Sequence, residues 1–281
     1  MRRSGWFWRV IAIPVLVAFG LVYLFPLYWL VATSLKGQSE LLSSIVPTLV
    51  PQAPTLEPFH TVLIEKGNWK LLRNSVLVCA ATVLTTLTLG LLITYPITRL
   101  PVSRGVRVGV LNWALSLRFL PPVAVVVPYF GVVRTLQLYD NPLALVLIYT
   151  LFNLPFSIWM LKSFLSEVPL ELEEAAFVDG ATRPVAFFRV LLPLVAPGLL
   201  AAGIIIFAFA WSEFLFALIL TQTPRAQTFP VGVQTFVTQF NLIWNEMAAA
   251  GLIALLVPLI LMILARRYVL AGLTFGVIRE K

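Results

Sequence analysis

The chain has 281 residues, of which 60% are hydrophobic and only 11% are charged, and its mean hydropathy is +0.95. A soluble globular domain carries roughly 25% charged residues. The composition therefore excludes most soluble enzymes, disordered proteins and nucleic-acid-binding proteins, although the net charge is +8. In a membrane protein an excess of Lys and Arg sets the topology rather than binding polyanions. We expect a single membrane-embedded unit over residues 1–281, with no nucleic-acid partner.

Cysteine and histidine are too few for the commonest metal and catalytic sites. The single cysteine, Cys79, excludes an intrachain disulfide and a multi-cysteine metal site. The single histidine, His60, argues against a His-rich metal or catalytic centre. We expect no catalytic residue, metal or cofactor on this chain.

Long stretches with few or no charges predict membrane-spanning helices, which need about 20 mostly apolar residues each. Six stretches qualify, and they are predicted in chain order at residues 10–34, 74–98, 108–133, 141–162, 195–221 and 246–266. The first is longer than the apolar region of a signal peptide, which has about 7–15 residues. We interpret it as a retained helix. The predicted fold class is an all-α polytopic membrane protein with six transmembrane helices.

The distribution of Lys and Arg predicts the orientation, because inner loops carry more of them. If the N-terminus is cytoplasmic, thirteen lie in inner segments and six in outer segments, with Arg118 inside a span. Both termini are therefore expected in the cytoplasm. The first outer loop is long and proline-rich, which disfavours regular structure.

The inner loop at residues 163–193 is the only inner segment rich in charges of both signs, and its sequence predicts a helix–turn–helix outside the bilayer. Ser166 is expected to cap the first helix, and Thr182 to cap the second with Pro184 in its first turn. Gly180 is a natural helix stop because glycine accepts a positive φ. The acidic first half argues against an ordinary membrane-surface helix, which is usually rich in Lys and Arg. From the residues alone, docking into another protein and a plain loop helix both remain open.

This loop resembles the signature of a known family. The run Glu174-Ala175-Ala176, then Asp179-Gly180 and Pro193, is similar to the EAA motif of permease subunits of binding-protein-dependent ABC importers. Further stretches resemble carbohydrate-type permeases of the MalG-like branch, the smaller permease of maltose-type importers. They are Arg118-Phe119-Leu120-Pro121-Pro122, Phe152-Asn153-Leu154-Pro155-Phe156, Trp211-Ser212-Glu213-Phe214-Leu215 and Ala271-Gly272-Leu273-Thr274.

The resemblance implies a type I ABC importer permease fold in the cytoplasmic (inner) membrane of a bacterium or archaeon. It also implies the partners, which are a second permease subunit, an ABC ATPase dimer and an extracytoplasmic binding protein that delivers a sugar. The coupling loop would seat in the ATPase, with Glu174 and Asp179 making polar contacts and Ala175, Ala176 and Gly180 allowing close approach. The chain has no Gly-x-x-x-x-Gly-Lys-[Ser/Thr] phosphate loop. ATP and Mg²⁺ are therefore expected on the partner ATPase, and this chain is not expected to be an enzyme.

Polar residues inside the predicted spans are candidates for the translocation pathway. A charge near the bilayer centre costs about 2.5–3.5 kcal/mol on insertion scales, so Arg118 and Glu213 should face protein or water. Together with Asn153, they are expected either to line the pathway or to form hydrogen bonds between helices. Helix positions indicate that Arg118 and Glu213 do not pair with each other.

Two other classes of protein compete with the importer permease. A self-contained secondary transporter or channel often contains internal repeats with matching broken helices, and we find none in this sequence. An intramembrane serine protease needs Ser and His within its spans, whereas His60 lies in a loop.

Overall fold

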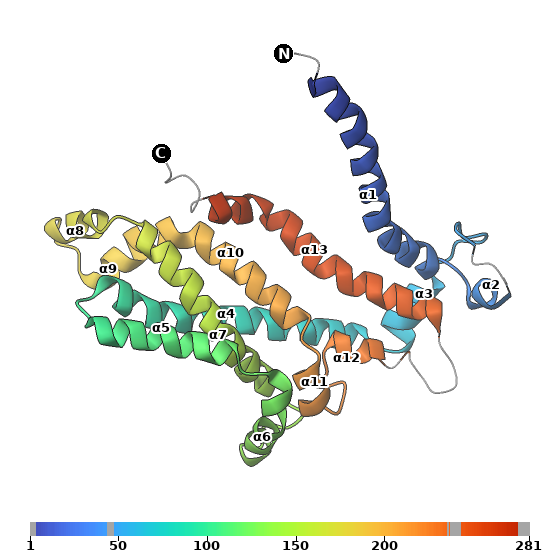
Figure 1. Cartoon of the computed structure of the whole chain (residues 1–281). Coiled ribbons are helices and arrows are strands. Elements are labelled where there is room, and N and C mark those ends of the chain that lie inside the picture. The colour runs from blue at the N-terminus through green and yellow to red at the C-terminus, as the bar shows by residue number, and fades with distance from the viewer. Residues whose placement is uncertain (1–3, 44–47, 235, 237–242, 275–281) are drawn as a thin grey trace. The chain divides into compact units, whose positions relative to one another are not determined.

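The computed structural model describes residues 4–43, 48–234, 236 and 243–274, with side chains described for residues 12–42, 48–234, 236 and 243–266. Within these ranges every regular element is a helix (Figure 1). The α-helices are α1 (Ser4–Ser34), α2 (Gln38–Ser43), α3 (Glu57–His60), α4 (Trp69–Arg99), α5 (Arg104–Arg118), α6 (Pro122–Thr135), α7 (Pro142–Glu167), α8 (Glu171–Val178), α9 (Arg183–Ala186), α10 (Leu192–Trp211), α11 (Leu215–Leu220), α12 (Phe229–Gln234) and α13 (Trp244–Thr274). Two short π-helices follow α3 and α9, and they are η1 (Thr61–Glu65) and η2 (Phe187–Leu191).

Five helical segments of the described chain are long and apolar enough to cross a membrane. They are Ala12–Ser34, Trp69–Arg99, Pro142–Glu167, Arg183–Trp211 and Trp244–Arg266. A sixth span is obtained if α5 and α6 are counted together, and these two helices are bent by 98° at their junction. The structure is thus the polytopic all-α fold that the sequence predicts.

The third and fifth predicted spans are not continuous helices. We expected one helix over residues 108–133, but the chain leaves helical geometry after Arg118 and resumes at Pro122. Pro121 and Pro122 explain the break, because a proline lacks an N–H and keeps the residue before it out of the α region. Accordingly, Pro121 is extended, with φ −69° and ψ 125°. The stretch 195–221 is likewise divided, since α10 ends at Trp211 and α11 begins at Leu215.

The described parts of residues 1–69 and 232–256 form one compact unit. Between Ile13 and Val31 its helix α1 exposes large apolar side chains on every face, with Leu16 and Val22 each 70% exposed. In contrast, Lys36 just after α1 is only 1% exposed. Its ammonium group donates to the Thr48 carbonyl oxygen and lies 5.0 Å from the centre of the Trp29 ring. These contacts compensate the buried charge.

The described parts of residues 70–231 and 257–281 form a second compact unit, in which α7 is the central helix. It packs against α5 and α10. Two glycines allow close helix approach, because a Cβ at Gly90 of α4 would lie 2.3 Å from the Ser157 hydroxyl oxygen and one at Gly198 of α10 would lie 2.5 Å from the Phe164 ring. The α4–α7 contact also contains a hydrogen bond of 2.6 Å between the Thr85 and Thr150 hydroxyls.

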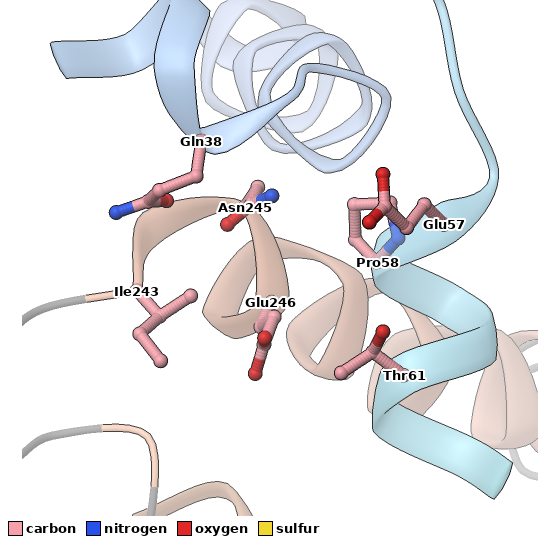
Figure 2. A pocket seen from close by; sticks show the side chains of 7 residues that line it. All are labelled: Gln38, Glu57, Pro58, Thr61, Ile243, Asn245 and Glu246. Carbon is pink, nitrogen blue, oxygen red and sulfur yellow. The ribbon is translucent and has the colours of Figure 1, made fainter. Parts of the chain in front are cut away.

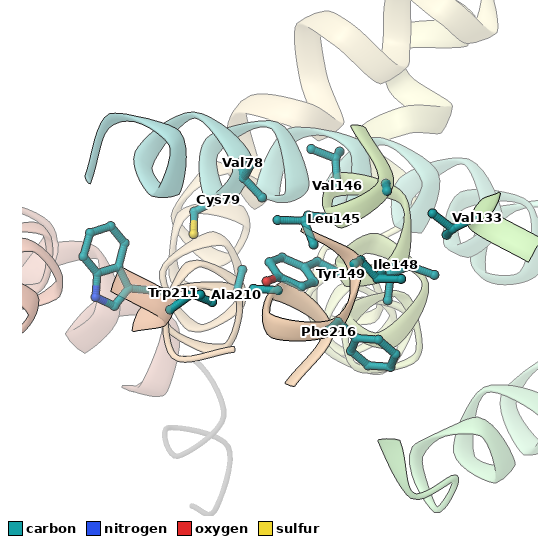
Figure 3. Packing of buried hydrophobic residues seen from close by; sticks show 14 of the residues in the cluster. Val78, Cys79, Val133, Leu145, Val146, Ile148, Tyr149, Ala210, Trp211 and Phe216 are labelled. Atoms are coloured by element: carbon teal, nitrogen blue, oxygen red, sulfur yellow. The ribbon is translucent and has the colours of Figure 1, made fainter. Parts of the chain in front are cut away.

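The hydrophobic core of this second unit gathers around Tyr149 (Figure 3). Tyr149 is 2% exposed, and its ring lies among Leu145, Ile148 and Phe216, with its hydroxyl directed toward Ala210. Because α4, α6, α7, α10 and α11 all contribute to the cluster, the core joins the middle of α7 to both sides of the α10–α11 break.

Hydrogen bonds attach the loop after α11 to two other elements of the second unit. The Asn74 amide of α4 donates to the carbonyl oxygens of Pro224, Arg225 and Gln227 at 3.1–3.2 Å. The Asp140 carboxylate, in the turn between α6 and α7, accepts from the backbone N–H groups of Gln222 and Thr223 at 2.8 and 2.9 Å and from the Thr223 hydroxyl at 2.6 Å.

These contacts determine how Asp140 responds to pH. Partial burial acts to raise the pKa of Asp140, but the hydrogen bonds from Thr223 and Gln222 and the nearby Arg225 charge outweigh it, so the net pKa is lowered. A lowered folded-state pKa adds stability at pH values above the ordinary aspartate pKa of about 3.9, and that stability is lost as the pH falls through the lowered value.

We predict that Asp140→Asn destabilises the protein by about 1 kcal/mol at neutral pH, because the amide replaces one accepting oxygen with a donor. In detergent this should lower the thermal midpoint by about 2–4 °C, and the deficit should shrink in acid. Asp179→Asn is the control, since the Asp179 side chain is exposed and should tolerate the change. Equal thermal midpoints for Asp140→Asn and the unaltered protein at neutral pH would show that the hydrogen bonds accepted by Asp140 do not stabilise the fold.

Candidate functional site

The residues of the predicted coupling loop form a short helix with a well-defined end. Helix α8 carries Glu171, Glu173 and Glu174 in its first turn, where acidic side chains are favourable. It ends at Val178, and Gly180 has φ +85°. The N–H of Gly180 donates to the Phe177 carbonyl oxygen at 3.0 Å and that of Ala181 to the Ala176 carbonyl oxygen at 2.9 Å. This is the Schellman arrangement, and it confirms the predicted stop at Gly180.

The two predicted helix caps in this loop have different outcomes. Ser166 lies inside α7, which continues to Glu167, and α8 begins later with Leu170 at its N-cap position. The prediction that Ser166 caps the first loop helix is therefore wrong, because the membrane span extends further than expected. Thr182 does occupy the N-cap position of α9, with Pro184 in the first turn, but its side chain makes no cap hydrogen bond.

The predicted coupling residues are mostly exposed on this chain. Glu174, Ala175, Asp179, Gly180 and Pro193 are exposed, and Ala176 is half-buried. Val178, on the same side of α8 as Glu174, is 87% exposed. This side of α8 thus presents one carboxylate and small or branched apolar side chains, and we call the residues Glu174, Ala175 and Val178 the outer face of α8.

The opposite side of α8 is fixed by a buried ion pair that the sequence did not indicate. Arg99 Nε, at the end of α4, lies 2.8 Å from Glu173 Oε1, and the two side chains are 6% and 2% exposed. The N–H does not point at the oxygen well enough to count as a hydrogen bond. Arg99 Nη2 also donates to the carbonyl oxygens of Leu165 and Val168 at 2.7 and 2.8 Å. We call this cluster of α4, α7 and α8 the Arg99 junction.

Three predicted polar residues of the spans line one cavity. The cavity has a volume of about 220 Å³, and Arg118, Asn153 and Glu213 all contribute to its wall. The remaining lining residues are Pro122, Tyr149, Phe152, Phe209, Ala210 and Phe216. Because α5, α6, α7, α10 and α11 each supply residues, both helix breaks of the second unit adjoin this cavity.

The side chains of Arg118 and Asn153 differ in their burial and in their polar contacts within the protein. Arg118 is exposed at the end of α5, and its guanidinium carbon lies 5.9 Å from the centre of the Phe156 ring and 5.1 Å from that of Phe209. Among the described residues, no carboxylate forms an ion pair with it. Asn153 is 6% exposed, and its amide nitrogen donates to the Tyr149 carbonyl oxygen at 2.8 Å.

Glu213 has a structural role in addition to its place in the cavity wall. Its Oε1 accepts from the Phe216 N–H at 2.9 Å and its Oε2 from the Ala217 N–H at 3.3 Å. The carboxylate therefore satisfies two free N–H groups at the start of α11, where a negative charge is also favoured. As expected, Arg118 and Glu213 do not form an ion pair.

The first unit contains another cavity, which the sequence did not predict. It has a volume of about 250 Å³ and is lined by Gln38, Glu57, Pro58, Thr61, Ile243, Asn245 and Glu246 (Figure 2). Glu246 pairs with Lys66 of the same unit. In the described part of the chain, no group of three or more His, Cys, Asp or Glu side chains is placed to hold a metal ion.

Apolar helices joined to an exposed Glu-Ala-Ala helix are the arrangement that the resemblance to ABC importer permeases implies. The family described as "Binding-protein-dependent transport system inner membrane component" matches residues 86–274. The chain belongs to this family, and it is a multi-pass protein of the inner membrane.

Curated relatives match nearly the whole chain. The sulfoquinovosyl glycerol transport system permease protein of Agrobacterium fabrum is 36% identical over 268 residues, covering 95% of this chain and 92% of the relative. The trehalose transport system permease protein of Mycobacterium tuberculosis is 34% identical, covering 99% and 98%. The trehalose/maltose transport system permease protein of Thermococcus litoralis is 30% identical, covering 96% and 97%.

Solved structures share the fold. A chain of a bacterial ABC transporter involved in the import of the acidic polysaccharide alginate matches with a TM-score of 0.77 at 20% identity, covering 95% of this chain and 98% of that chain. A chain of the MetNI methionine ABC transporter matches with a TM-score of 0.58 at 18% identity, covering 77% and 98%. The predicted importer permease fold is therefore confirmed.

We predict that Glu173→Gln destabilises the Arg99 junction by about 3–5 kcal/mol, because removing one partner leaves the buried Arg99 charge uncompensated. Glu174→Gln is a matched control, since it makes the same change one residue later on an exposed side chain and should cost no more than about 0.5 kcal/mol. Thermal unfolding in detergent and proteolysis near α8 would measure both.

A second variant separates the lost charge pair from a general packing defect. The double change Arg99→Met with Glu173→Leu replaces both charges by apolar groups and should recover most of the stability lost in Glu173→Gln. If Glu173→Gln and Glu174→Gln had the same thermal midpoint, the ion pair would not contribute to the fold.

Proposed function

We propose that this chain is the transmembrane subunit of an ATP-driven ABC importer that translocates a mono- or oligosaccharide or a sugar derivative. An extracytoplasmic binding protein delivers the sugar, a second permease completes the pathway, and a separate ABC ATPase dimer supplies energy through α8. The observation that carries the proposal is the outer face of α8, which belongs to a helix held rigidly by the Arg99 junction yet leaves Glu174 and Val178 exposed. Membership of the binding-protein-dependent family supports the same partners.

The sugar class rests on the relatives. Those most similar include permeases whose names assign them to sulfoquinovosyl glycerol, diacetylchitobiose, trehalose and trehalose/maltose transport. These solutes have sugar units in common, although they differ in size and charge. A sugar is therefore the solute class that agrees with this set of relatives.

Exposed apolar surface supports a membrane-embedded complex with other helices. On α1, Leu16, Val22 and Leu24 are each more than 60% exposed within this chain. A surface of this kind is stable only against lipid or a partner helix. We assign the N- and C-termini and α8 to the cytoplasmic side, since most Lys and Arg fall on that side.

Energy is supplied from outside this chain in the proposed complex. The sequence has no phosphate-binding loop, so ATP and Mg²⁺ bind the partner ATPase and this chain itself is not an enzyme. Its contribution is mechanical. Closure of the ATPase around nucleotide moves α8, and the Arg99 junction passes that movement to α4 and α7.

Reconstitution tests the proposal against a self-contained transporter. The chain should co-purify with a second permease and an ATPase. In liposomes with the binding protein, one of trehalose, maltose, diacetylchitobiose or sulfoquinovosyl glycerol should stimulate ATP hydrolysis. Sugar uptake by this chain alone, without ATP, would overturn the proposal in favour of a secondary transporter or channel.

We predict that Glu174→Lys uncouples ATP hydrolysis from uptake and lowers sugar uptake at least about tenfold, since a lost charged contact costs about 1.5–3 kcal/mol. Glu171→Lys is the matched control, because it reverses the same charge in the same helical turn outside the motif and should have a much smaller effect. Uptake in proteoliposomes, with the amount of assembled complex measured in parallel, distinguishes lost coupling from lost assembly. Unimpaired uptake by Glu174→Lys would contradict α8 docking.

We also predict that Gly180→Pro abolishes coupling, because proline cannot adopt the φ of +85° that ends α8. Gly180→Asn should retain most of the uptake, since asparagine visits this region at low cost. Both variants replace the same glycine, but only Gly180→Pro prevents the positive φ. Their comparison therefore separates the effect of the backbone conformation on uptake from the effect of losing glycine. Equal uptake by both would show that the end of α8 has no mechanical role.

A further inference from the structure

The cavity of the second unit lies at membrane depth. Tyr149 and Asn153 lie about 10–17 Å along α7 from its first residue, at about 1.5 Å per residue, in a helix of 26 residues. The hydrocarbon core of a bilayer is about 30 Å thick. Polar side chains at this depth are costly unless they face protein or water, and they commonly mark a solute path.

The cavity wall contains polar groups that the protein itself does not fully use. The Tyr149 hydroxyl is fully buried and interacts with the Glu213 carboxylate, so it is not open to a ligand. Asn153 uses its amide nitrogen for the Tyr149 carbonyl oxygen, and its amide oxygen has no partner among the described residues. The Asn153 amide oxygen and the exposed Arg118 guanidinium are therefore the polar groups of the cavity wall that remain available to a ligand.

Aromatic rings form the other walls of the cavity. Phe152, Phe209 and Phe216 all line it, and the rings of Phe152 and Phe216 lie 5.0 Å apart. The Arg118 guanidinium, which covers the Phe209 ring, offers five donors in a fixed plane. Aromatic faces pack on the C–H surface of a sugar ring, while planar polar groups and hydroxyls bind its hydroxyl groups.

The volume of the cavity corresponds to one sugar unit. Its 220 Å³ equals about seven water molecules at roughly 30 Å³ each. That is the scale of a single pyranose ring. Binding sites of this kind are mostly apolar, with a few converging polar groups.

We propose that this cavity is a transient binding site for one pyranose unit of the transported saccharide, with Asn153 and Arg118 contacting sugar hydroxyls and Phe152, Phe209 and Phe216 packing on the ring. The proposal rests on the function proposed above and deepens it, because it makes this subunit a direct contact of the solute. The position of the cavity beside both helix breaks means that movement of α6 or α11 changes its walls.

The test uses the assembled complex, with its binding protein, partner permease and ATPase, trapped with ATP and orthovanadate. The probe is the radiolabelled form of whichever sugar, among trehalose, maltose, diacetylchitobiose and sulfoquinovosyl glycerol, stimulates ATP hydrolysis. After gel filtration, the sugar retained per complex is counted. Arg118→Met and Asn153→Leu should each reduce retention about tenfold, since each removes a hydrogen-bonding group from the cavity.

Thr150→Val is the matched control, because it removes the hydroxyl of the neighbouring residue, which is bonded to Thr85 and does not line the cavity. It should retain as much sugar as the unaltered complex. Co-elution of all subunits in each variant establishes that assembly is intact, and Arg118→Met keeps an unbranched side chain beside the Phe209 ring.

Failure of the cavity proposal and failure of the proposed function give different results. If the unaltered complex responds to a sugar but Arg118→Met and Asn153→Leu retain it normally, the cavity is not a sugar site and the importer function stands. If no sugar stimulates ATP hydrolysis in the unaltered complex, the proposed function fails and the cavity assignment fails with it.

Discussion

The buried Arg99–Glu173 ion pair is the interaction on which the arrangement of the second unit depends. Two charges removed from water are stable only when each is compensated. Glu173 and the last carbonyl oxygens of α7 together provide this for Arg99. As a result, α8 cannot pivot freely on its connecting residues, because turning it would separate a buried charge from its partner. If a loop helix lacked such an anchor, a partner protein could displace it without moving the spans.

Close packing extends this constraint from the junction toward the cavity. Gly90 brings α4 against Ser157 of α7, and Gly198 brings α10 against Phe164 of α7. A side chain at either glycine would collide with its neighbour, so the helices are held in contact along the half of α7 nearest the junction. Packed interiors transmit displacement because they are dense and have few alternative arrangements. The three helices are therefore expected to move together.

The sequence predicts features that depend on local chemistry and misses those that depend on tertiary contacts. Hydropathy locates the spans, and the stop at Gly180 is confirmed because only glycine readily adopts its positive φ. In contrast, Glu173 and Glu174 are adjacent carboxylates with the same local signal, and only the position of Arg99 decides that Glu173 faces inward. The sequence places Pro121 and Pro122 inside the predicted third span, but it does not give the 98° bend between α5 and α6. Capping of α11 by Glu213 was hidden because α11 itself was expected to continue the span.

Helix α7 joins the two candidate sites physically. Asn153 at the cavity and Leu165 at the Arg99 junction lie about 18 Å apart along this one helix, at about 1.5 Å per residue. The helix is continuous between them, although it contains Pro155. On the cavity side the neighbouring elements are broken, at residues 119–121 and 212–214, so their short halves α6 and α11 can rearrange without unfolding a complete span. A rigid helix that ends among broken ones converts a small displacement of α8 into a change of cavity shape, which is the coupling that an importer permease requires.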